Sequence, residues 1–180
     1  MKAFILLLFA LVTAFSPTSS WGASTACEGY SPEKLGDVFE TAIRLNQRFK
    51  QLARSNDSDD AAYKAVGKKN EGFAETTAIP CLDRATKILL GSKHQLLLGK
   101  VLALADSYEN MADESVSETL AFLYVARTDD FENLLRSRSK PSRVALLKRT
   151  QEGLQRQGTD IAKAIAADRA TRLEKLLVAY

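Results

Sequence analysis

Residues 31–52 read SPEKLGDVFETAIRLNQRFKQL, and this stretch decides the fold class. Serine followed by proline is typical of a helix start, because serine caps the first turn and proline fits the first helical position. Behind this start the apolar residues recur at spacings of three and four, which places them on one face of a helix. These residues are Leu35, Val38, Phe39, Ala42, Leu45, Phe49 and Leu52. The stretch therefore predicts a long amphipathic helix.

The rest of the chain repeats this pattern in shorter units. Pro80 and Pro141 each begin a new apolar stripe with helical spacing. The most apolar stretch is 96–111, and a helix that is apolar over most of its circumference is expected in the middle of a bundle. Ser92 and Gln95 have the spacing of a capping box, so we expect Ser92 to cap this helix.

No segment shows the sustained alternation of apolar and polar residues that is typical of strands. Residues 67–77 contain two glycines and no clear period, so they are expected to form the longest irregular stretch. The composition, 46% hydrophobic and 26% charged over 180 residues, suits one ordinary globular domain. We therefore predict an all-α fold, a single-domain bundle or irregular array of six to seven helices.

The N-terminal segment has the pattern of a secretory signal peptide. Residues 4–15 are almost wholly apolar, follow a single lysine and precede small polar residues. This run is shorter than the roughly 20 residues that a transmembrane helix needs. The predicted organisation is a signal peptide over 1–23, with cleavage between residues 22 and 26, and a single helical domain over 24–180. We expect a periplasmic or secreted protein whose mature chain has no transmembrane span.

Two cysteines, Cys27 and Cys81, follow the predicted cleavage site. An even number of cysteines in an exported protein predicts a disulfide, which here would staple the N-terminal end of the domain to a later helix. An alternative stays open, because Ser24-Thr25-Ala26-Cys27 resembles the end of a bacterial lipobox, in which the cysteine is lipidated.

The sequence contains no recognisable catalytic or metal-binding constellation. His94 is the only histidine, and no haem-attachment, zinc-protease, phosphate-loop or calcium-loop motif is present. We expect a non-enzymatic protein with no catalytic residues, no metal site and no cofactor. A remote alternative is a cell-wall hydrolase, because Glu114-Ser115 is similar to the Glu-Ser motif of lytic transglycosylases.

Charge is distributed unevenly along the C-terminal half. Residues 106–132 contain eight acids and a single base, whereas residues 133–151 contain six bases and no acid. Two interpretations are open: neighbouring helices pair their charges inside the molecule, or a bipolar surface steers a charged partner. Under the second interpretation the candidate partner-binding residues are Arg136, Arg138, Lys140, Arg143, Asp113 and Glu114. The basic stretch contains no aromatic residue, so nucleic acid is not an expected partner.

These observations favour a protein-binding module of the cell envelope, such as an inhibitor, an immunity protein or a helper of an envelope machine. The expected partner is another protein, for example a charged toxin or an envelope component. The alternative is a periplasmic carrier of an apolar ligand or lipid, with the 96–111 helix lining its pocket. The oligomeric state is not predicted.

Overall fold

The computed structural model describes residues 27–55, 60–108, 114–156 and 160–179, and these residues form helices without any strand. The predicted all-α fold is confirmed. The elements are α2 (Pro32–Arg54), α3 (Asp60–Phe73), the π-helical segment η2 (Ala74–Ala78), α4 (Ile79–Gly91), α5 (Gln95–Ser107), α6 (Glu114–Ala126), α7 (Thr128–Arg136), α8 (Lys140–Gln155) and α9 (Asp160–Ala179). Since α3, η2 and α4 follow one another without a break, the described part holds seven uninterrupted helical runs. The predicted signal peptide, 1–23, lies outside the described residues.

Two helix starts combine a serine cap with a proline, and the first of them was predicted. The Ser31 hydroxyl accepts a hydrogen bond from the backbone N–H of Lys34 at 3.3 Å, and proline occupies the first turn of α2. At the start of α8 the Ser139 hydroxyl accepts from the backbone N–H of Ser142 at 3.4 Å, and again proline follows. These caps satisfy backbone donors that have no partner within the helix.

The predicted capping box before α5 is wrong. The Ser92 hydroxyl donates to the carbonyl of Ile88 at 2.7 Å, so it closes α4 instead of opening α5. Helix α5 begins at Gln95, whose side-chain amide donates to Asp130 of α7 at 3.2 Å. Both side chains that the pattern assigned to a local cap are therefore used by other contacts.

The predicted irregular stretch, 67–77, is also wrong, because it is helical throughout. Gly67 faces the ring of Phe49, where an added β-carbon would lie 3.0 Å from a ring carbon. The Asn70 amide is buried and donates to Asn46 of α2 at 3.1 Å. One of the two glycines that suggested a loop, Gly67, therefore serves close packing of α3 against α2, whereas Gly72 has no neighbour within 4 Å of an added β-carbon.

The most apolar helices lie at the centre of the molecule. Helix α5 packs against α2, α4, α7 and α8, and α6 packs against α4, α7, α8 and α9. The side chains of Leu98 and Leu102 on α5 and of Leu120 and Leu123 on α6 are fully buried. Leu96, at the start of α5, is the exception, since it is 77% exposed. Among the described residues no helix is both long and apolar enough to cross a membrane.

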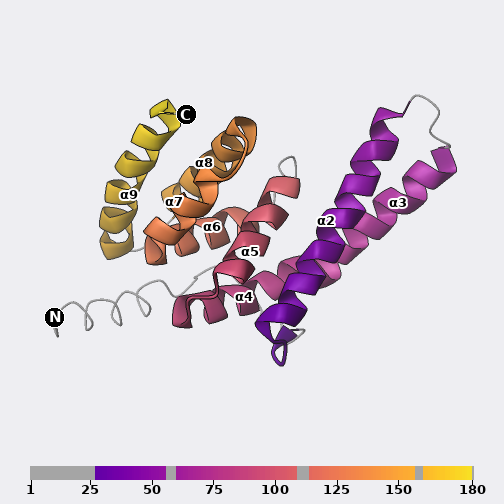
Figure 1. Cartoon of the computed structure of the whole chain (residues 1–180), viewed down its shortest axis with the longest axis horizontal. Helices are drawn as coiled ribbons and strands as arrows, with labels where there is room; N and C mark the ends of the chain where they lie inside the picture. Colours follow the sequence, from indigo (N-terminus) through magenta and orange to yellow (C-terminus); the bar gives the residue numbers. More distant parts are fainter. Residues whose placement is uncertain (1–26, 56–59, 109–113, 157–159, 180) are drawn as a thin grey trace.

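The N-terminal end is held by a disulfide between Cys27 and Cys81, whose Cα atoms are 5.4 Å apart. Both cysteines are buried, and the bond joins the residues just before α2 to the start of α4. Figure 1 shows α2 and α3 side by side, extending away from the group formed by α6 to α9. We call residues 44–54 of α2 and 60–69 of α3 the arm, and the remaining described residues the body.

Candidate functional site

The four predicted basic residues lie together at the turn between α7 and α8. Arg136 and Lys140 are exposed there. Arg143 instead donates to the backbone carbonyls of Arg136 and Arg138, at 3.5 and 3.2 Å, and so closes the turn. Two of the four side chains are thus left on the surface by the fold.

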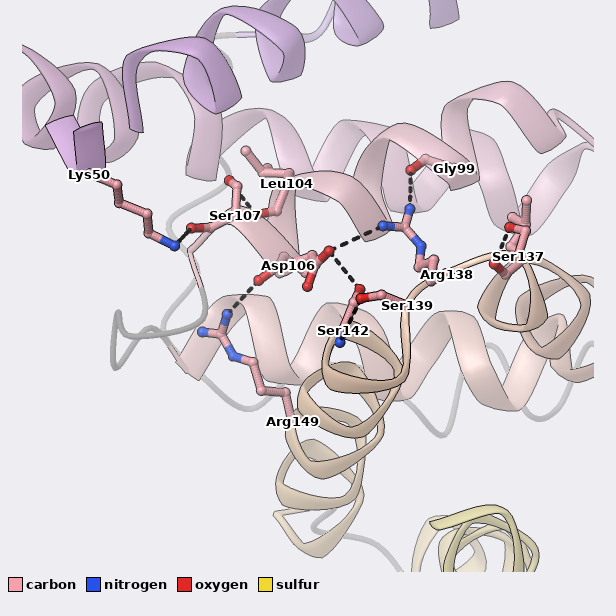
Figure 2. A network of polar contacts seen from close by, with 12 residues as sticks. Lys50, Gly99, Leu104, Asp106, Ser107, Ser137, Arg138, Ser139, Ser142 and Arg149 are labelled. Carbon is pink, nitrogen blue, oxygen red and sulfur yellow. Dashed lines mark hydrogen bonds and ion pairs between the residues drawn. The ribbon is translucent and has the colours of Figure 1, made fainter. Parts of the chain in front are cut away.

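Arg138 points into the body and not toward solvent. Its guanidinium donates to the Gly99 carbonyl at 3.1 Å and pairs with the Asp106 carboxylate at 3.4 Å, as Figure 2 shows. The Asp106 carboxylate also accepts a 2.6 Å hydrogen bond from the Ser142 hydroxyl. Burial lowers the pKa of Arg138, and the nearby Asp106 opposes this shift. The group fastens the start of α8 to the side of α5.

A second arginine of the basic stretch, Arg149, is only 8% exposed. It donates to the carbonyls of Ala105 and Tyr108, both at 3.0 Å. These carbonyls belong to the last turn of α5, where backbone acceptors have no helical partner and the helix dipole favours a cation. Arg149 therefore acts as a buried cap contributed by α8.

Two acids of α7, Glu132 and Asp130, also form contacts within the body. The Glu132 carboxylate accepts from the buried Tyr124 hydroxyl at 3.0 Å and pairs with Arg172 of α9 at 2.6 Å. Burial raises the pKa of Tyr124, and the Glu132 charge adds to this effect. Asp130 pairs with Arg127 at 2.6 Å.

The two predicted acidic candidates lie apart from the α7–α8 turn. Glu114, at the start of α6, is exposed and pairs with Arg156 just after α8 at 3.5 Å. Asp113 lies outside the described residues. Among the described residues, one ion pair joins the acidic stretch 106–132 to the basic stretch 133–151, that of Arg138 with Asp106. Pairing between neighbouring helices, the first of the two interpretations, therefore accounts for only part of the charge polarity.

The arm differs from the body in how its charged side chains are placed. Its bases outnumber its acids, and most of these bases face solvent. Residues 44–69 contain seven bases and three acids, a formal charge of +4, whereas the whole chain has +3. The rest of the chain therefore has a formal charge of −1. The exposed bases of the arm are Arg44, Arg48, Arg54, Lys64, Lys68 and Lys69.

Few of these bases contribute a contact to the fold. Lys64 pairs with Asp60 in an exposed ion pair, and Arg44 donates to the Thr41 hydroxyl at 3.4 Å. The remaining exposed bases form no ion pair or side-chain hydrogen bond with any described residue. They are Arg48, Arg54, Lys68 and Lys69.

The arrangement carries an energetic cost for the free protein. Arg44 and Arg48 stand four positions apart on α2, and Lys64 and Lys68 do so on α3. Like charges at this spacing destabilise a helix by roughly 0.2–0.5 kcal/mol per pair. On α3 the ion pair of Lys64 with Asp60 offsets this cost, whereas Arg44 and Arg48 form no ion pair with a described residue.

Ring packing, buried hydrogen bonds and one base, Lys50, hold the arm in place. The Phe49 and Tyr63 rings stack with centroids 4.9 Å apart. At its base the buried Tyr108 hydroxyl donates to Asn70 at 2.8 Å, and burial raises the pKa of Tyr108 to about 12. Lys50 donates to the Ser107 carbonyl at 2.8 Å, as Figure 2 shows. These contacts fix the arm as a preformed surface.

The single histidine and the two cysteines belong to no metal-binding group among the described residues. His94 is exposed and precedes α5. Within the described ranges no group of three or more His, Cys, Asp and Glu side chains could hold a metal ion. Both described cysteines belong to the disulfide.

Comparison with known proteins adds no assignment: no protein family, no curated protein and no solved structure matches this chain.

The arm was not among the candidate sites taken from the sequence, although its signal was present. Its bases recur at helical spacing on both sides of residues 56–59. In the linear sequence, however, Asp57, Asp59 and Asp60 lie between the two groups, so together they do not form one run of a single sign. The packing of α3 along α2 joins them into one surface.

Proposed function

We propose that this protein is a non-catalytic protein-binding module of the cell envelope, an inhibitor, immunity-type protein or helper, and that the arm is its binding element. One observation carries the proposal: a preformed pair of helices extends from the body and exposes bases that the fold does not use. Surfaces whose charge is not paired internally steer association and select partners. The location in the envelope rests on the predicted signal peptide and on the disulfide, which is typical of an oxidising compartment.

The alternatives receive less support. Leu97, Leu98, Val101 and Leu102 of α5, which would line a carrier's pocket, are packed in the core. Glu114, on which the hydrolase alternative depends, is exposed and paired with Arg156.

The proposal is tested by capturing partners from the envelope fraction of the producing cells, with chemical crosslinking and identification of the captured proteins. The arm variant Arg48→Glu with Arg54→Glu is compared with Arg136→Glu and Lys140→Glu, which makes the same charge change at the α7–α8 turn. We expect the wild type and the turn variant to capture the same protein and the arm variant to lose it. Equal capture by all three proteins would contradict the proposal.

A further inference from the structure

We infer that the partner presents an acidic protein surface, in which carboxylates about one helical turn apart contact the bases of the arm. This inference rests on the proposed function and adds the chemistry of the partner. It starts from the spacing of the bases, since Arg44 and Arg48 lie four positions apart, as do Lys64 and Lys68. Residues at this spacing share a helix face and are separated by roughly 6 Å along the axis. A segment with acids at the same interval matches either row.

The presence of arginine among these bases further defines the chemical group that the arm binds. Arg48 and Arg54 are exposed, and neither guanidinium donates to a described residue. A guanidinium binds a carboxylate through two parallel hydrogen bonds, which fixes orientation as well as charge. The arm therefore offers directional carboxylate binding in addition to a general positive potential.

An anionic membrane is a poorer match to the same surface. The large apolar side chains that the described residues expose are Leu90, Leu96 and Val178, and none of them belongs to the arm. Helices that bind the membrane interface bury an apolar face among the lipid headgroups and acyl chains. The arm can touch lipid phosphates through its bases, but it has no large exposed apolar group to insert.

Single-stranded nucleic acid and a second copy of this chain also fit less well. Nucleic-acid bases stack on accessible aromatic rings, whereas Phe49 and Tyr63 stack on each other. A second copy would bring another segment 44–69 of formal charge +4, while acids such as Asp106 and Glu132 are held in contacts within the body. Charge complementarity thus favours a different, acidic protein.

The test uses the full mature chain and two fluorescent helical peptides of about 20 residues, long enough to hold some helix in water. One peptide has Glu at every fourth position and the other has Gln at the same positions. Binding is measured by fluorescence anisotropy at about 50 and 200 mM salt, where screening of surface charge differs strongly. We expect the Glu peptide to bind more tightly than the Gln peptide, with an affinity that falls as salt rises.

Two variants test whether the Glu peptide binds to the arm. Arg44→Glu with Arg48→Glu should weaken binding of the Glu peptide about tenfold or more. Each substitution replaces an attraction between a base and an acid with a repulsion between two acids, which lowers the affinity. The matched control, Arg136→Glu with Lys140→Glu, makes the same charge change and should alter the affinity less than twofold. Circular dichroism checks that both variants fold. If the first fails to fold, Arg48→Gln with Lys68→Gln supplies the same test with neutral side chains.

The outcomes separate this inference from the proposed function. Equal weakening by both variants, or equal binding of the two peptides, would overturn the inference. So would arm-dependent binding to vesicles of phosphatidylglycerol and phosphatidylcholine that exceeds binding to the Glu peptide. A captured protein that requires the arm but binds independently of salt would leave the proposed function standing and refute the acidic contact. Loss of arm dependence in the capture experiment itself would refute the proposed function.

Discussion

The arm and the contact region of α5 with α8 both contain many charged residues, yet they use them in opposite ways. Between α5 and α8, Arg138 and Arg149 donate to backbone carbonyls, and Arg138 also pairs with Asp106. In the arm, Arg48 and Arg54 extend from α2 without a described partner. A basic stretch in a sequence can therefore serve folding or binding, and the difference depends on which acceptors the fold brings close to it.

The largest expected effect concerns the packing that brings α8 against α6. A β-carbon added to Gly153 would overlap the backbone carbonyl of Ser117 and lie 3.0 Å from Ala121. Because the obstacle is mainly backbone, Gly153→Ala should lower the free energy of unfolding by about 3 kcal/mol. Urea denaturation followed by circular dichroism measures this change.

Gly72→Ala in α3 is the matched control, since no atom lies within 4 Å of its added β-carbon. Alanine is the better helix former, so this variant should be more stable than wild type by about 0.5–1 kcal/mol. Equal stability of Gly153→Ala and Gly72→Ala would contradict the close approach of α8 to α6 at Gly153.

The next prediction compares a buried arginine of the body with an exposed arginine of the arm. Arg149→Met removes the donor to the Ala105 and Tyr108 carbonyls. Leaving these buried acceptors unpaired should cost about 2–3 kcal/mol. Arg48→Met, on the exposed face of the arm, should change stability by less than about 0.5 kcal/mol. Similar losses in both variants, measured by urea denaturation, would contradict the distinction between arm and body.

A smaller effect concerns the junction of arm and body, and it depends on pH. Tyr108→Phe removes the hydrogen bond to the buried Asn70, so it should cost about 1 kcal/mol near pH 7. Burial raises the pKa of Tyr108 to about 12, above the value near 10 of an unfolded tyrosine. The stability that this neutral hydroxyl contributes is complete below pH 10 and is lost as pH rises through the folded pKa.

The gap between wild type and Tyr108→Phe should therefore narrow as the pH increases from about 10 to 12. Stability against urea across this range measures the gap. A gap that stays constant would show that Tyr108 does not titrate in contact with Asn70.

The sequence predicts the helices better than it predicts the surfaces between them. Ser31 caps its helix as the local pattern predicts, because a cap depends only on neighbouring backbone groups. The helical character of 67–77 was missed because it depends on contacts with Phe49 and Asn46 of α2, which are distant in sequence.

The candidate site was harder to predict for the same reason. The bases at 136–143 form a visible run, but the acceptors of Arg138 and Arg143 are set by the packing of α8 against α5 and by the turn itself. The bases of the arm are interrupted by acids in the sequence and become one surface only when α3 packs on α2. Helical period identifies a face of one helix, whereas a binding surface made of two helices requires their packing.

The central claim is that the fold does not use the four exposed bases of the arm that form no ion pair or side-chain hydrogen bond with a described residue. Urea unfolding of a variant in which all four are neutral tests this claim most directly. Arg48, Arg54, Lys68 and Lys69 are replaced together by Gln, and unfolding is measured at about 50 mM and 1 M salt. The account predicts a variant that is equal to wild type or more stable by up to about 1 kcal/mol at low salt, with the difference vanishing at high salt, because repulsion within α2 and α3 is relieved. A loss of more than about 1 kcal/mol at low salt would show that these bases stabilise the fold, and it would contradict the account.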